Sequence, residues 1–222
     1  MPNYVRRKYR MARYARERGI AIPSAFRPAT PAFGRPARQL LRRIQTHAKL
    51  PVTGEWSARV QDLLFPLTFA QRAARAALSQ VGVTESPAGS NDGARVRVYQ
   101  QVTGMLRQPW CASFLSWAYR KADPECPLPS AAAWVPAWAA AARNGSPRAF
   151  RQVSRVALRR GDYVTLWGTA HIEMFIRWIV PGVLAECVGG NTSPAGRNAN
   201  GGMVARTRRY TREMGVCGRV RP

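Results

Sequence analysis

The residue pattern changes near Val153, and this change constrains the fold more than any other feature of the chain. Before that point apolar residues recur at the three-to-four-residue spacing of amphipathic helices, as in Leu40, Leu41 and Ile44. After it come short β-rich runs, GDYVTLW, HIEMFIRWIV and VLAECV, separated by Gly or Pro-Gly turns. Helices followed by an antiparallel meander of strands predict an α+β domain.

The 222 residues are enough for one full domain and a smaller companion. Residues 1–30 are interpreted as a basic arm, helical over about 5–18, and a proline-punctuated linker. Residues 31–66 predict a small all-α unit in which PVTGEW joins two helices, and Pro66 closes it. Residues 67–222 form the larger domain, with helices expected over about 68–80 and 93–103, from Cys111, and on both sides of Pro136.

Charge narrows the set of partners. The chain has 35 Lys and Arg against 11 Asp and Glu, a net charge of +24, and both parts of the chain share the excess. A chain of this charge binds polyanions: nucleic acids, anionic membrane surfaces or acidic wall polymers. In the nucleic-acid alternative, Arg35, Arg38, Arg42 and Arg43 would contact phosphates.

Several other classes are disfavoured. The basic N-terminus lacks the apolar core of a secretory signal, and the longest apolar run, AAAWVPAWAAAA, is too short to span a bilayer. Two histidines without an HExxH pattern argue against a zinc site, and no calcium-loop spacing occurs, so we expect no metal or cofactor. The four cysteines are too widely spaced for a disulfide framework, and we expect Cys126, Cys187 and Cys217 to be structural.

The stretch RQPWCASFLSW places Cys111 in the first turn of a predicted helix. Unpaired N–H groups and the positive end of the helix dipole stabilise a thiolate there, and the same N–H groups can bind an oxyanion. The alternative is a small apolar residue among aromatic neighbours.

A base for this thiol is available in His171, which heads a strand whose residues Glu173 and Phe175 share its face. If the following hairpin turns over residues 180–182, the residue numbers of two paired positions add up to about 362. His171 then faces Asn191. Asn191 is therefore the first candidate to orient the imidazole. Glu173 and Glu186 are the alternatives.

The ordered motifs ESPAGSNDG, QPWCASFLSW, RRGDYVTLW, HIEMFIRW and GGNTS resemble the CHAP family of cysteine, histidine-dependent amidohydrolases and peptidases. The resemblance covers about residues 70–220 and implies a papain-like fold, with Cys111 as nucleophile, His171 as base and Asn191 as the polar third member. It also implies that Trp110, Asn91 and Asp92 line the substrate groove, although a core role for Trp110 is an equal alternative.

Two positions depart from that family pattern. Many members carry an acid two places before the asparagine, where this chain has Gly189. The residue two places after the histidine is usually small, and here it is Glu173.

Residues 31–66 resemble half of a small three-helix peptidoglycan-binding domain, whose repeat has a helix ending in LQ, a VTG loop and a second helix. The matching residues are Leu41, Ile44, Gln45, Leu50, Val52, Thr53, Gly54 and the helix after Trp56.

Together these resemblances imply a phage lysin that cleaves amide bonds of peptidoglycan. Its partners would be peptidoglycan and anionic wall polymers, without specific nucleic acid, and we expect a monomer. Such a protein is made in the host cytoplasm and reaches the wall through lysis machinery or in a virion. The alternatives are a non-catalytic wall- or polyanion-binding protein with a vestigial site and, third, a nucleic-acid-binding protein.

Overall fold

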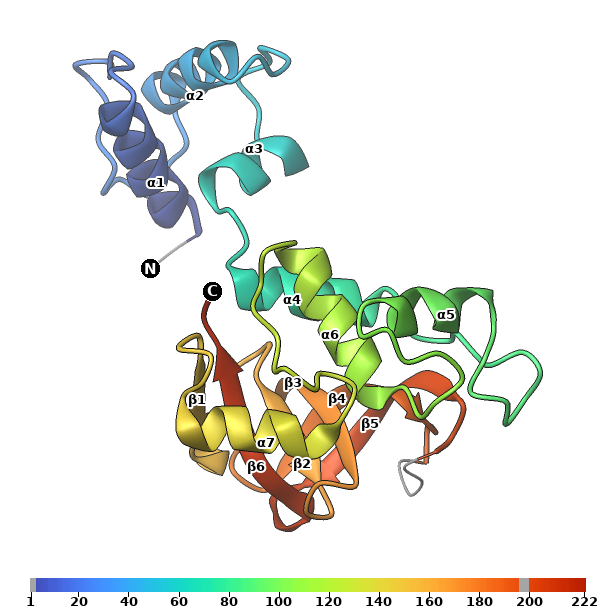
Figure 1. Cartoon of the computed structure of the whole chain (residues 1–222). Coiled ribbons are helices and arrows are strands. Elements are labelled where there is room, and N and C mark those ends of the chain that lie inside the picture. Colours follow the sequence, from blue (N-terminus) through green and yellow to red (C-terminus); the bar gives the residue numbers. More distant parts are fainter. Residues whose placement is uncertain (1–2, 196–199) are drawn as a thin grey trace. The chain divides into compact units, whose positions relative to one another are not determined.

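The computed structural model describes residues 3–195 and 200–222, and these fall into two compact units that meet in sequence between Leu67 and Thr68 (Figure 1). The described part is α+β, with helices preceding an antiparallel six-stranded sheet. No helix within these residues is both long and apolar enough to cross a membrane. The helices are α1 (Asn3–Glu17), α2 (Arg35–His47), α3 (Ala58–Leu64), α4 (Phe69–Leu78), α5 (Ala94–Gln101), α6 (Cys111–Ala122) and α7 (Val135–Asn144). The strands are β1 (Phe150–Val153), β2 (Tyr163–Leu166), β3 (His171–Val180), β4 (Leu184–Thr192), β5 (Met203–Tyr210) and β6 (Met214–Val220).

In the first unit, α1 packs against α2 and α3 and contributes Met11, Ala12 and Ala15 to one core with them. The segment after α1 folds back, because the buried Lys8 ammonium donates hydrogen bonds to the carbonyls of Arg27, Thr30 and Ala32. The expected arm and linker are thus part of the packed unit in the described residues, while Met1 and Pro2 lie outside them.

The second unit places α4, α6 and α7 against one face of the sheet, with α6 on β3 and β4, and α5 packs against α6 (Figure 1). The strand order is β1-β6-β2-β3-β4-β5, so β2 to β4 form the expected meander, and β5, which was not predicted, continues it. The last strand, β6, inserts between β1 and β2. Ile172, Met174 and Ile176 join the helix-side core, and Phe175 joins a smaller cluster, as the alternation in β3 predicts.

Candidate active site

Cys111 is the first residue of α6 and follows Trp110 at the N-cap. The helix is fixed there because Phe114, Leu115 and Ala118 are buried in the helix-side core. The first main-chain hydrogen bond of the helix runs from Phe114 N to Trp110 O at 2.8 Å. The N–H groups before Phe114 therefore have no hydrogen-bond acceptor within the helix. This is a site at which a helix stabilises a thiolate or an oxyanion.

His171 is the first residue of β3, pairs with Leu166 of β2, and is 0% exposed. Its Nε2 lies 3.4 Å from Glu173 Oε1. Burial opposes the charged imidazole, but its interactions with the Cys111 thiol and the Glu173 carboxylate prevail and raise the pKa of His171 to about 9. Neither ring nitrogen of His171 forms a hydrogen bond of good geometry within the described residues. The imidazole therefore lies near Cys111 and Glu173 without a fixed hydrogen bond to either.

Glu173 is buried and bound on both carboxylate oxygens. Thr207 Oγ1 donates to Oε2 at 2.6 Å, and Arg209 binds both oxygens, with Nε at 3.0 Å from Oε2 and Nη2 at 2.5 Å from Oε1. Burial favours the neutral acid, but Arg209 and His171 outweigh it and lower the pKa of Glu173 to about 2. A full negative charge therefore faces the imidazole at neutral pH.

Gly189 explains how Glu173 fits at this position. A Cβ at Gly189 would lie 2.7 Å from Glu173 Cγ and 3.0 Å from Glu173 Oε1. A side chain at position 189 and the one at position 173 would therefore compete for the same volume. The small residue on β4 therefore makes room for the acid on β3.

The carboxamide of Asn191 points elsewhere than the imidazole. Its Nδ2 donates to Asn91 Oδ1 at 3.2 Å, and its Oδ1 accepts from Gly202 N at 3.3 Å. The neighbouring Gly190 lies against α6, where a Cβ would come within 2.6 Å of Phe114 Cβ. The structure thus brings Asn191 next to the start of α6 and places Glu173, not Asn191, against His171.

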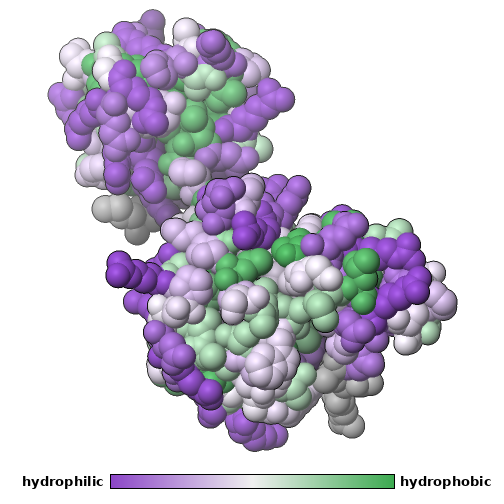
Figure 2. All heavy atoms as spheres, in the orientation of Figure 1, coloured by the Kyte–Doolittle hydropathy of each residue, from purple (hydrophilic) through white to green (hydrophobic). Residues whose placement is uncertain are grey.

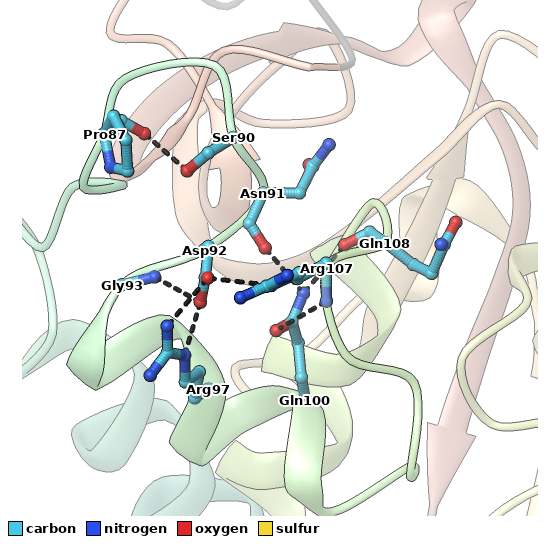
Figure 3. Close-up of polar contacts among 9 residues, drawn as sticks. All are labelled: Pro87, Ser90, Asn91, Asp92, Gly93, Arg97, Gln100, Arg107 and Gln108. Atoms are coloured by element: carbon cyan, nitrogen blue, oxygen red, sulfur yellow. Dashed lines mark hydrogen bonds and ion pairs between the residues drawn. The ribbon is translucent and has the colours of Figure 1, made fainter.

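Asn91 and Asp92 belong to one polar cluster (Figure 3). Asp92 accepts hydrogen bonds from Arg97, Gly93 N and Arg107, which hold its pKa well below its usual range. Both carboxylate oxygens of Asp92 are therefore occupied in holding the loop that precedes α5. Asn91 has a left-handed backbone with φ 51°, and its carboxamide extends away from the Asp92 cluster in Figure 3.

Trp110 is buried and lines no open surface. It is 0% exposed, stacks on Tyr99 with ring centroids 5.7 Å apart, and donates from Nε1 to Glu85 Oε1 at 2.8 Å. The structure gives this side chain the core role that was the alternative, and its role in lining a substrate groove stays a prediction. Because Trp110 directly precedes Cys111, its packing fixes the position at which α6 begins.

The remaining candidates lie outside this arrangement. Glu186 is bound by Arg177 and Arg206 rather than by the imidazole. Cys126, Cys187 and Cys217 are buried and form no disulfide, and burial raises the pKa of all three thiols, to about 12 for Cys126 and about 11 for Cys217. They remain unreactive thiols at neutral pH.

Two site residues escaped the sequence analysis. Arg209 lies on β5, and only the strand pairing brings it to Glu173. Trp167, in the β2–β3 turn, has φ 49° and lies with its ring centroid 6.2 Å from that of His171, with the Arg209 guanidinium 5.1 Å from the indole. The only sequence signal that could have suggested Trp167 is its position four residues before His171, across a Gly-containing turn.

In the described part of the chain, no group of three or more His, Cys, Asp or Glu side chains is placed to hold a metal ion. Comparisons with protein-family models, curated proteins and solved structures find no match for this chain.

Proposed function

We propose that the chain is a cysteine peptidoglycan hydrolase of the CHAP type, which cleaves an amide bond of the bacterial wall. The observation that carries this proposal is the buried His171, whose Nε2 lies 3.4 Å from the ionised Glu173 and whose pKa is raised by the helix-start thiol of Cys111 and by Glu173. A nucleophile, a base and an orienting acid in contact form the arrangement that acyl transfer needs.

In the proposed reaction the Cys111 thiolate attacks the amide carbonyl, and N–H groups of the first turn of α6 bind the oxyanion. His171 then protonates the leaving amine, and water hydrolyses the thioester. Glu173 takes the role of the third member, since it orients the imidazole and stabilises its charged form. Asn191 would act indirectly, through its hydrogen bond to Asn91 in the loop before α5.

The test is digestion of purified walls by the wild-type chain and by Cys111→Ala and His171→Ala, with mass spectrometry of the released fragments. We expect new amine and carboxyl ends from the wild type alone, and the fragments identify the cleaved bond. Circular dichroism melts show whether the variants fold. A folded Cys111→Ala protein that clears walls would overturn the proposal.

A non-catalytic polyanion-binding role is the second candidate, favoured by the burial of both Cys111 and His171 and by the +24 charge. It predicts salt-sensitive adhesion to walls, no released peptides, and no alkylation of Cys111 by iodoacetamide at neutral pH.

A further inference from the structure

The turn between β3 and β4 carries an apolar run, IVPGVL, at residues 179–184. Its side chains reach solvent: Ile179 is 38% exposed, Val180 46% and Val183 50%. Figure 2 shows hydrophobic residues at the surface of the chain among hydrophilic ones, so the exposure of a single apolar side chain is ordinary. Apolar side chains that gather in one exposed patch are instead typical of a binding surface.

Two residues from other segments enlarge this apolar surface. Val156 lies exposed in a short 3-10 helix, and a Cβ at Gly182 would lie 3.8 Å from its Cγ1. Tyr210, also exposed, pairs with Leu184 at the end of β5. The exposed side chains together are called the turn patch, which comprises Val156, Ile179, Val180, Val183 and Tyr210.

Hydrogen bonds hold this turn in place. Val183 N donates to Val180 O at 3.0 Å. Thr211 donates from N to Val183 O at 3.0 Å and from Oγ1 to Gly182 O at 2.9 Å. The exposed side chains are thus fixed in position beforehand, and binding requires little ordering of the backbone.

Positive charge exceeds negative charge around the turn patch. The segments 154–158, 177–186 and 206–213 contain six arginines and two glutamates. Arg209 is buried on Glu173, so five arginines remain against the two acids, an excess of three positive charges.

The two acids are Glu186 and Glu213, and both are occupied. Glu186 is bound by Arg177 and Arg206, and Glu213 accepts a hydrogen bond from Tyr210 N at 2.7 Å. The positive excess therefore belongs to the other arginines.

These arginines are exposed at the border of the patch. Arg155 directly precedes Val156, and Arg208 and Arg212 lie on either side of Tyr210 in sequence. The Arg212 guanidinium lies 4.4 Å from the centre of the Tyr210 ring. An apolar surface with a basic border results, and such a surface favours an anionic partner with an apolar layer.

Charge and shape distinguish between the possible occupants. A second copy of the chain would bring the same arginines against one another, which disfavours self-association through this surface. A hairpin turn with exposed side chains on both strands is convex, so it suits a partner that can close around it. The headgroup layer of an anionic bilayer admits apolar side chains, and its phosphates attract arginine.

We propose that the turn patch docks on an anionic lipid surface. The aliphatic side chains enter the headgroup layer, and the bordering arginines contact lipid phosphates. Such peripheral docking needs no membrane-spanning segment. His171 lies at the opposite end of the ten-residue strand β3, about 30 Å away at the usual rise per residue. Docking therefore leaves the candidate active site free, and the proposal does not depend on the proposed function.

The test is co-sedimentation of the full-length Cys111→Ala protein with vesicles of phosphatidylcholine alone or of equal parts phosphatidylcholine and phosphatidylglycerol. We expect about tenfold tighter binding to the anionic vesicles. The triple variant Ile179→Ser, Val180→Ser and Val183→Ser should bind them about tenfold more weakly, because apolar insertion is lost while charge is kept.

The matched control is Val81→Ser, Met105→Ser and Leu106→Ser, which changes three exposed apolar residues of the same unit outside the patch. It should bind like the parent protein. Thermal melts verify that both triple variants fold.

The arginines are tested in the same way. Arg208→Gln with Arg212→Gln should weaken binding to the anionic vesicles about tenfold. Arg143→Gln with Arg148→Gln removes the same charge from exposed positions outside the patch and should have a smaller effect.

A fluorophore at the turn reports insertion directly. In the Cys111→Ala protein the other native cysteines are buried, so Val180→Cys can be labelled with an environment-sensitive dye. We expect its emission to rise and shift to shorter wavelength with anionic vesicles, and to stay unchanged with poly-L-glutamate, which has charge but no apolar layer.

Four outcomes would overturn the proposal. Equal binding of the two triple variants, equal effects of the two arginine pairs, or attachment without the spectral shift would mean that charge alone governs binding. The same spectral shift with poly-L-glutamate would assign the patch to an acidic chain. A dimer in size-exclusion chromatography that the turn variant abolishes would assign it to a second copy.

Discussion

The Glu173 carboxylate is the residue-scale feature on which the candidate site depends. It is buried, it carries a full negative charge, and both of its oxygens are bound by Thr207 or Arg209. A carboxylate held in this way can stabilise a charged imidazole without moving and without taking its proton. The raised pKa of His171 is the measurable sign of that role.

The first prediction concerns the pH dependence of activity. If the imidazolium–thiolate pair is the active form, kcat/KM should fall as the pH rises through about 9, the pKa of His171. Glu173→Gln removes the charge that favours the imidazolium, so the pKa of His171 should fall and the alkaline limb should move to lower pH. We also expect a loss of about 10²-fold in kcat/KM.

Two measurements check this prediction. NMR titration can follow His171 directly, because the chain has only two histidines and His47→Gln assigns the other. A raised folded-state pKa stabilises the protein below the unfolded value of about 6.5, and this stabilisation is lost as pH rises through about 9. The free energy of unfolding of wild type should therefore fall over that window by more than that of Glu173→Gln. An unchanged alkaline limb in a folded Glu173→Gln variant would contradict the assignment.

The second prediction is a reciprocal exchange between positions 173 and 189. Gly189→Glu alone should destabilise the protein, because its Cβ would lie 2.7 Å from Glu173 Cγ. Glu173→Gly alone leaves the buried Arg209 without its carboxylate. The double variant moves the acid from β3 to β4, so it should be more stable than additivity predicts, by about 1–3 kcal/mol.

Urea unfolding of the four proteins gives this coupling, and wall digestion reports activity. We expect the double variant to be more active than either single variant, since the carboxylate returns to the same volume beside His171. Strictly additive free energies would show that the two side chains do not share that volume.

At the scale of elements, the strand register shows what local pattern can and cannot predict. The hairpin arithmetic placed partners at a sum of 362, and Met174 pairs with Val188 at that sum. The turn itself is different, because Val180 pairs with Leu184, and two irregularities in the ladder return the register to its expected value. Helical spacing and strand alternation are local signals, so they predicted most of the helices, the strands β2 to β4, and Cys111 and His171 at the start of their elements. The helix expected before Pro136 does not form, because α7 begins at Val135 with the proline in its first turn.

The rest depends on contacts between distant segments. The insertion of β6 between β1 and β2, and the pairing of Arg209 with Glu173 across β4, follow from sheet order, which no short pattern encodes. The same holds for Lys8, whose buried ammonium binds carbonyls of a segment that sequence pattern alone presents as a linker.

The third prediction concerns the β2–β3 turn that carries Trp167. The turn is fixed by hydrogen bonds from Trp167 N to Glu213 O and from Thr165 Oγ1 to Gly168 O, and it holds Trp167 in the left-handed region. Its ring covers His171 and Arg209, so Trp167→Ala should expose them to water and weaken their electrostatic contacts. We expect kcat/KM to fall about threefold to tenfold.

Trp167→Phe is the control, because it keeps an aromatic ring over His171, and it should retain most of the activity. Trp167→Gly relieves the backbone strain but lacks the ring, so it should behave like Trp167→Ala in the wall-digestion assay. If all three variants match the wild type, the indole does not contribute to the site.

At the scale of the whole molecule, positive charge is spread along the entire chain, but α1 carries a dense cluster of arginines. Arg6, Arg10, Arg13 and Arg16 follow one another at helical spacing and line one open groove with Tyr9. Screening by salt weakens attraction between such a face and an anionic polymer. The first unit therefore has a basic surface suited to anionic polymers, the class of partner that the proposed function requires, and it is separate in sequence from the catalytic candidates.

The last prediction distinguishes adhesion through the arginines of α1 from adhesion through the total charge of the chain. Replacing Arg6, Arg10, Arg13 and Arg16 together by Gln should reduce adhesion of the full-length Cys111→Ala protein to purified walls and flatten its salt dependence, because fewer counterions are released on binding. The matched control replaces four exposed arginines of the second unit, Arg143, Arg148, Arg151 and Arg160, by Gln, which removes the same charge. Pull-down with walls across a salt series measures both. A larger loss from the α1 variant assigns adhesion to this face, whereas equal losses would mean that total charge alone governs binding.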